Sequence, residues 1–402
     1  MRVLLLGEYS NLHYTLARAL REEGHEVRLV SDGDDWKGFQ QDICLRRNST
    51  GLIDTLTYLF RLWKEMRHWH DYDVVQLINP VHFIELKAGR GIRIYDHLRK
   101  RNRKVFLGAF GDDYYYIRDS YEHRPLRYCD FYTSTHEVRH EWNTNNITCW
   151  LHDKAMVHSC THIATTCDGI ISALYEYHLA YQHTDDPTII EKETFIPLPI
   201  WIENESMAID SNQPEMTEKV HDENEAKKKI RPQREHACGS TATSSKIKFF
   251  IGIQRLRSKL KGTDILLSIA RNLQEQYPDR MELIVAENLP FNDYIHILSS
   301  CDILLDQIYS YTPAMNALQA MARGVVAVSG GEEEQYALLG ENVLRPIVNV
   351  QPDEADIHAR LEYLILHPEV LAELKEQSKI YVRRHHDAHI IAHRYIAFWQ
   401  SR

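Results

Sequence analysis

The sequence lacks any apolar run approaching the roughly 18 to 20 residues that a helix needs to span a bilayer. The apolar stretch from Val3 to Leu6 is too short for a signal peptide, and it predicts a first strand instead. The seven cysteines are odd in number and none forms a C-x-x-C motif, which favours free thiols in a reducing compartment. Together these absences predict a cytoplasmic protein.

The chain also lacks the excess of basic residues that nucleic-acid-binding proteins carry, because its formal net charge is −10. Positive charge is concentrated in residues 87–104, where eight Lys and Arg side chains accompany one acid, Asp96. Such a basic helix could contact anionic headgroups on the inner membrane face, and a solvated helix face is the alternative. We therefore expect no nucleic-acid partner and, at most, peripheral membrane contact.

A chain of 402 residues exceeds what one hydrophobic core usually supports, so two domains are expected. Residues 203–245 are rich in Glu, Asp, Lys, Ser and Thr without an apolar period, which predicts a flexible polar linker or insert. The predicted units are a first domain (1–202), this linker (203–245), a second domain (246–384) and a C-terminal helix (385–402).

Short apolar runs alternate with helical patterns in both halves, which is typical of doubly wound parallel sheets. The predicted strands include Val27 to Val30, Val74 to Ile78 and Val105 to Ala109 in the first half. In the helix predicted between Leu52 and Trp69, apolar residues recur at a helical period, and we expect that face to be buried.

The segment Asn316 to Arg323 is rich in helix formers, Gly324 suits a left-handed cap, and Val325 to Val328 suits a buried strand. A helix N-terminus presents unpaired N–H groups and partial positive charge. The turn before Asn316 is therefore a predicted seat for a diphosphate.

A second phosphate signal follows the predicted strand Phe249 to Ile253, where Arg255, Arg257, Lys261 and Gly262 occupy the loop at the strand's carboxyl end. A helix is predicted to begin near Gly262, and a cation there opposes the helix dipole unless an anion is bound. An inert, solvated Lys261 is the alternative. The spacing does not decide which of the two arginines would face a ligand.

Together these motifs resemble the GT-B fold, family-four-like (retaining) glycosyltransferases of bacterial polysaccharide synthesis. That family carries a glycine-arginine-lysine-glycine loop and a Glu-Ala-Met-Ala-x-Gly helix, and residues 248–349 match best. The resemblance implies two Rossmann-like domains facing a cleft and a terminal helix that crosses back to the first domain. It also implies that Arg255 or Arg257 and Lys261 hold the diphosphate of a nucleotide diphosphate sugar.

The chain departs from the family at its two glutamates, where Tyr311 and Gln319 stand with seven residues between them. A glutamine can still accept a ribose hydroxyl, and the loss of charge costs about 1 kcal/mol, roughly fivefold in affinity. Candidate replacements are Asn316 and the acidic run that contains Glu334.

The acceptor side would be formed by loops that leave the carboxyl ends of the first domain's strands. The candidates are Asp112 and Asp113, as a base or as polyol ligands, together with Asn79, His82 and the Gly7 turn. For the aspartates a helix cap is the alternative, for Gly7 a plain turn, and for His82 simple packing.

No Asp-x-Asp motif lies in residues 246–402, the predicted donor half, and the histidines at 385, 389 and 393 lack a completing ligand, so we expect metal independence and no cofactor. The sequence thus predicts a hexosyltransferase that uses a nucleotide diphosphate sugar and a saccharide or lipid-linked saccharide acceptor. Two alternatives stay open: a catalytically inactive GT-B binding or scaffold subunit, and a nucleotide-sugar epimerase.

Overall fold

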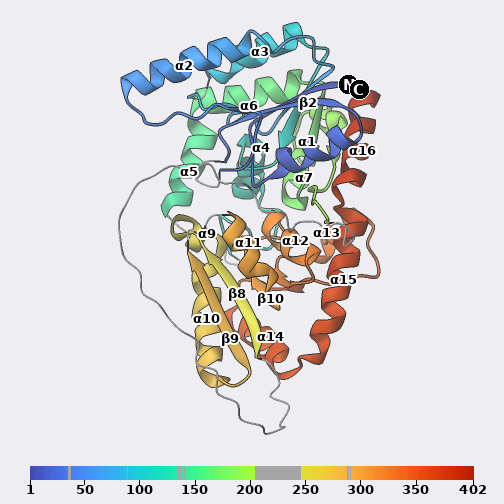
Figure 1. Ribbon diagram of the computed structural model, residues 1–402. Helices are drawn as coiled ribbons and strands as arrows, with labels where there is room; N and C mark the ends of the chain where they lie inside the picture. The colour runs from blue at the N-terminus through green and yellow to red at the C-terminus, as the bar shows by residue number, and fades with distance from the viewer. Residues whose placement is uncertain are drawn as a thin grey trace, which may run out of the picture.

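The structure is a computed structural model that describes residues 1–34, 38–87, 89–133, 138–139, 141–203, 246–287, 289 and 291–402. Two α/β units, each built on a parallel sheet, lie one above the other, with helices α11, α12 and α13 between the second sheet and the first unit (Figure 1). The predicted linker, apart from Glu203, falls outside these described residues.

The first sheet has seven parallel strands in the order β3-β2-β1-β4-β5-β6-β7. Its order reverses between β1 and β4, whose neighbouring carboxyl ends are a favoured place for ligands in such sheets. The strands are β1 (Arg2–Leu6), β2 (Glu26–Ser31), β3 (Ile43–Cys44), β4 (Val74–Leu77), β5 (Lys104–Ala109), β6 (Gly169–Ser172) and β7 (Glu193–Phe195).

Helices join these strands, as parallel pairing requires. They are α1 (Leu12–Glu22), α2 (Leu52–Met66), α3 (Gly91–Arg101), α4 (Tyr114–Arg118), the π-helix Asp119–His123, α5 (Glu141–His152), α6 (Lys154–Thr166), α7 (Tyr175–Gln182) and α8 (Pro187–Lys192). The predicted strands of this half are confirmed. The short edge strand β3 was not predicted, because no apolar run marks it in the sequence.

The predicted burial of α2 is wrong. Its buried side chains are Tyr58 and Leu62, and Glu65 pairs with Arg28 of β2 at 2.7 Å. The predicted apolar stripe instead faces solvent, with Phe60 63% and Trp63 55% exposed. Helical periodicity identified an apolar face, but it did not identify what covers that face.

The second sheet has five parallel strands in the order β12-β11-β10-β8-β9, so its order reverses between β8 and β10. The strands are β8 (Ile247–Ile253), β9 (Met281–Glu287), β10 (Ile303–Leu305), β11 (Val326–Ser329) and β12 (Val348–Asn349). The helices are α9 (Ser258–Lys261), α10 (Thr263–Gln276), α11 (Phe291–Ser299), α12 (Met315–Ala322), α13 (Glu333–Leu339), α14 (Glu354–Leu366) and α15 (Glu369–His385).

The last helix, α16 (Ala388–Ser401), returns to the first unit, as predicted, and the two chain ends lie together (Figure 1). The Trp399 indole N–H donates to Gln76 of β4 at 3.3 Å, and Lys104 donates to the Trp399 carbonyl at 3.1 Å. Burying this tryptophan to 1% exposure removes a large apolar surface from water. The helix thereby ties the end of the chain to the first sheet.

Two further observations concern the described part of the chain as a whole. No helix in it is long and apolar enough to cross a membrane. Its cysteines are all unpaired, at positions 44, 129, 149, 160, 167 and 301.

Candidate functional site

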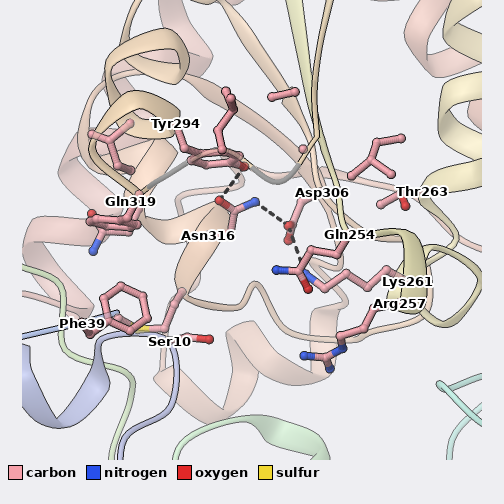
Figure 2. Close-up of a pocket in the computed structure, with 17 residues that line it drawn as sticks. Ser10, Phe39, Gln254, Arg257, Lys261, Thr263, Tyr294, Asp306, Asn316 and Gln319 are labelled. Atoms are coloured by element: carbon pink, nitrogen blue, oxygen red, sulfur yellow. Dashed lines mark hydrogen bonds and ion pairs between the residues drawn. The ribbon is translucent and has the colours of Figure 1, made fainter. Parts of the chain in front are cut away.

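A cavity that is open to solvent lies at the point where the order of the second sheet reverses. Its walls come from the ends of β8 and β9, from α9 to α12 and from two residues of the first unit, Ser10 and Phe39 (Figure 2). Crevices outside the carboxyl ends of parallel strands are where open α/β sheets bind ligands.

A chain of polar contacts lines one wall of this cavity (Figure 2). The Lys261 ammonium lies 3.8 Å from the buried Asp306 carboxylate. The Asn316 amide donates to the same carboxylate oxygen at 2.8 Å and accepts from the Tyr294 hydroxyl at 2.9 Å. Asp306 therefore holds a cation beside the first turn of α12.

Lys261 ends α9 rather than beginning the next helix, which corrects the predicted dipole conflict. A cation suits a helix C-terminus, so the dipole alone gives no reason for an anion here. The chain then turns at Gly262, with φ of +72°, before α10 begins. A β-carbon at Gly262 would lie 2.3 Å from the Ile308 side chain, so glycine allows both the turn and the close packing.

The two arginines of the preceding loop differ in placement. Arg257 lines the cavity, whereas Arg255 is 77% exposed and forms an ion pair with Glu287 at 2.8 Å. Arg257 also faces the first unit, since its charge opposes the burial-driven rise in the pKa of Asp112. The choice that the spacing left open therefore falls on Arg257 in this structure.

The N-terminus of α12 points into the same cavity, with Met315 and Asn316 in its wall. Part of the predicted anion-binding turn before Asn316 is already hydrogen-bonded to a protein side chain. The backbone N–H groups of Tyr311 and Thr312 both donate to the buried carboxylate of Glu176, at 2.5 and 3.1 Å. The Tyr311 and Thr312 amides of the turn are thus already bonded to protein, whereas the first amides of α12 face the cavity.

Gln319, one turn further along α12, also lines the cavity. Its side-chain carbonyl accepts a hydrogen bond from Arg323 at 2.8 Å, which fixes the orientation of the amide. Near it the wall becomes apolar, formed by Leu289, Phe291 and Ile295. Phe39 of the first unit meets Phe291 edge to face, with ring centroids 5.2 Å apart.

Tyr311 and Glu334 lie at the junction between the two units, outside the cavity. The Tyr311 hydroxyl accepts a hydrogen bond from the Arg127 backbone at 2.7 Å. The Arg127 guanidinium pairs with Glu334 at 2.5 Å and with Glu332 at 2.6 Å. These side chains join the two units, and their place does not match the predicted donor contacts.

On the first unit, Asn79 and Asp113 are held by the protein itself. Asp113 caps α4 through the Tyr116 N–H at 2.9 Å and accepts from the Tyr181 hydroxyl at 2.7 Å. Asn79 donates to the Asp112 carbonyl at 3.0 Å and accepts from the backbone of the following turn. For Asp113, the structure places the side chain in the capping position that the sequence left open.

Asp112 has a different environment from its neighbour. Its carboxylate accepts a hydrogen bond from the Asn146 side chain at 3.1 Å, and the positive charge of Arg257 in the second unit acts on it. Burial raises its pKa, and the Arg257 charge and the Asn146 bond oppose that rise. Of the two predicted aspartates, Asp113 caps a helix and Asp112 does not, and neither lines the cavity described above.

Gly7 and His82 line a second, smaller cavity at the carboxyl ends of β1 and β4. Gly7 adopts φ of +85°, and a β-carbon there would lie 2.2 Å from Ile78. The following turn reaches the main cavity through Ser10. Of the predicted acceptor-side residues, Gly7 and His82 thus line the smaller cavity, whereas Asn79, Asp112 and Asp113 line neither cavity.

The sequence did not single out Glu8, Asp32 and Asp34, which also line the smaller cavity. Glu8 is 2% exposed and caps α1 through the Tyr14 N–H at 2.8 Å. Burial raises the pKa of Glu8 to about 8. Only its position after a strand could have marked it beforehand.

Among the residues that the structure describes, no cluster of three or more His, Cys, Asp or Glu could hold a metal ion. The three histidines near the C-terminus pair instead with glutamates: His385 with Glu341 at 2.8 Å, and His389 and His393 with residues at the end of α1.

No protein-family model matches the sequence, and no curated protein matches it. Solved structures do share its fold. They include a sucrose-phosphate synthase from Thermosynechococcus elongatus (TM-score 0.57, 12% identity, covering 100% of this chain and 98% of that one). Anabaena HepE in complex with UDP has a TM-score of 0.52 and 11% sequence identity to this chain, and the alignment covers 100% of both chains. A UDP-GlcNAc 2-epimerase from Neisseria meningitidis, bound to UDP-GlcNAc, has a TM-score of 0.51 and 10% sequence identity, again over 100% of both chains.

These similarities define the fold as the GT-B fold of glycosyltransferases, with two parallel-sheet α/β units, as predicted. Identity near one tenth supports the architecture and leaves substrates to be argued from the site.

Proposed function

We propose that this chain is a retaining glycosyltransferase of the family-four-like type, which moves a hexose from a nucleotide diphosphate sugar to a saccharide or lipid-linked saccharide hydroxyl. One observation carries the proposal. Lys261, Arg257 and the N-terminus of α12 converge on a single cavity at the reversal of the second sheet.

The donor would lie along this cavity. Lys261 and Arg257 would meet the diphosphate, the first α12 amides would donate to it, and Gln319 would accept from a ribose hydroxyl. The apolar wall around Phe291 suits the flat face of a base. Two cations and a helix end would then balance the diphosphate charge without a metal ion.

Transfer breaks the bond between the anomeric carbon and the diphosphate oxygen and forms one to the acceptor oxygen. Negative charge develops on the departing diphosphate, and donors that are already in place stabilise it best. The acceptor would approach from the first unit, where Asp112 could take the hydroxyl proton or hold it. Retention of configuration is part of the proposal by resemblance.

The alternative is a GT-B subunit that binds the donor without turnover. It is favoured by Tyr311, which is 2% exposed at the junction of the units, and by the neutral Gln319 in the cavity. Both positions hold a glutamate in the family that the sequence resembles. An epimerase on the same fold is the third possibility.

A product assay separates these functions. The protein is incubated with labelled UDP-, GDP- and ADP-sugars, with and without oligosaccharide acceptors, and products are resolved by chromatography. A new glycoside supports the proposal. We expect the donor sugar to be hydrolysed more slowly than it is transferred to the acceptor, because closure of the two units would exclude water. Donor binding without product supports the inactive subunit, and an isomerised sugar supports the epimerase.

A further inference from the structure

Helix α2 presents a continuous apolar face to solvent. Six large apolar side chains lie on it, each at least 36% exposed: Leu52, Ile53, Leu56, Leu59, Phe60 and Trp63. At 3.6 residues per turn these six positions span an arc of about 120°. Soluble monomers rarely leave such a contiguous apolar surface uncovered without a function for it.

The orientation of the helix is fixed from its other side. Tyr58 and Leu62 are 2% and 3% exposed in the core of the first unit, and Glu65 pairs with Arg28 of β2. Turning the apolar face inward would expose these two side chains and break the ion pair. The exposure of the apolar face is therefore built into the way α2 attaches to the sheet.

Cations border this face. Lys64 lies at the edge of this face on α2, and Arg67 follows the helix, with its guanidinium 4.9 Å from the centre of the Trp63 indole ring. Helix α3 adds exposed Arg93, Lys100 and Arg101. In the described part of the chain none of these five cations has an ion-pair partner, although the protein as a whole is acidic, with a formal net charge of −10.

Helices α2 and α3 are neighbours, because the His97 side chain of α3 lies beside the backbone of Met66 at the end of α2. Both lie at the end of the first unit that is remote from the second unit (Figure 1). The apolar face and the basic residues therefore belong to one outer surface, which leaves the cavity between the units accessible.

We infer that α2 docks on an anionic membrane surface, with its apolar face among the acyl chains and its cations, with those of α3, at the headgroups. A helix of this composition, with tryptophan and phenylalanine on one face and lysine and arginine beside it, binds in the plane of a lipid interface. The unpaired positive charge selects anionic lipid over an apolar protein surface. The inference stands whether or not the chain transfers sugar.

The test is co-sedimentation of the full chain with vesicles of phosphatidylcholine, with and without phosphatidylglycerol. The chain should bind the mixed vesicles, and rising salt should weaken binding. Phe60→Ser combined with Trp63→Ser should lower the partition coefficient at least about tenfold, because two large apolar side chains no longer enter the lipid. Val343→Ser combined with Ile390→Ser, which also removes two exposed apolar side chains, should leave it unchanged.

Arg93→Glu combined with Lys100→Glu separates the charge contribution, and it should reduce binding to mixed vesicles while leaving the melting temperature unchanged. Failure of the unmodified chain to bind phosphatidylglycerol vesicles would overturn the inference. So would equal binding by the Phe60 and Trp63 double variant. Sedimentation velocity without lipid gives the other decisive outcome, since a dimer that this variant abolishes would make the face an interface between two copies.

Discussion

Glu176 of the first unit accepts a 2.8 Å hydrogen bond from the hydroxyl of Thr312 in the second unit. The same buried carboxylate accepts from the Tyr311 and Thr312 amides. A carboxylate from one unit thus satisfies the turn that leads into α12 in the other. The contact fixes the helix that faces the candidate donor cavity relative to the first unit.

Replacing Glu176 with glutamine should weaken this junction. The shape is kept, but one acceptor oxygen becomes an N–H₂ group facing other donors, so unfolding free energy should fall by about 2 kcal/mol. Urea unfolding followed by circular dichroism measures the change, and hydrogen exchange at Tyr311 and Thr312 should accelerate. Glu191→Gln, on an exposed position of α8, is the matched control. If both variants are equally stable, the Glu176 hydrogen bonds do not stabilise the junction between the units.

The loop arginines provide a paired test of the donor site. Arg257→Ala should weaken nucleoside diphosphate affinity about tenfold, a loss of ~1.4 kcal/mol, because a guanidinium facing the cavity disappears. Arg255→Ala should change affinity by less than about twofold, since that side chain pairs with Glu287 outside the cavity. Isothermal titration with UDP, GDP and ADP measures both. The reverse ranking would mean that the loop rearranges around the ligand.

Gln319→Glu should strengthen donor binding. Arg323 already donates to the Gln319 side-chain oxygen, so a glutamate would be held in the same orientation, with a charged acceptor for the ribose. The expected gain is roughly fivefold, about 1 kcal/mol. It should appear with UDP and be absent with pyrophosphate, which has no ribose. No gain with either ligand would place the side chain away from the ribose.

His386 should make the fold sensitive to acid. Burial lowers the pKa of His386 to about 3, against about 6.5 when unfolded. Between these values the unfolded chain binds more protons, so unfolding free energy falls with decreasing pH by up to ~1.4 kcal/mol per unit. Urea unfolding at pH 5 and 7 should show a smaller decrease in His386→Asn than in the unmodified protein.

The control for that comparison is His70→Asn, because the His70 side chain is 47% exposed. Its pH dependence should match that of the unmodified protein. His13, buried with its pKa lowered to about 4, would still contribute to the loss of stability in acid in all three proteins. If His386→Asn keeps the full pH dependence, the buried neutral state of His386 is not its source.

The predictable parts of the fold were those with local signals. Apolar runs such as Phe249 to Ile253 identified the buried parallel strands, because both faces of those strands are covered. The helix before Gly324 ends as its residue types required, with Gly324 at φ of +72°. The cationic loop after β8 was recognisable because strand ends place such loops at the ligand edge of the sheet.

The unpredicted features depend on residues far apart in the sequence. Arg255 and Arg257 are equivalent by spacing. What distinguishes them is Glu287 at the end of β9, which pairs with Arg255 and not with Arg257. Glu176 accepts a hydrogen bond from a turn 135 residues further along the chain, and no sequence pattern predicts that contact. The exposure of α2 could not be inferred either, since periodicity gives the width of an apolar face and not its surroundings.

The most direct test of the account is a titration of the protein and of Lys261→Met with UDP, GDP and ADP, followed by melting temperature. At 100 times its dissociation constant a true ligand stabilises the fold by about 2.7 kcal/mol. We expect one nucleotide to raise the melting temperature of the unmodified protein and of a Lys259→Met control, and to raise that of Lys261→Met by about half as much or less. If all three nucleotides leave the unmodified protein's melting unaltered, the cavity between the units is not a nucleoside diphosphate site.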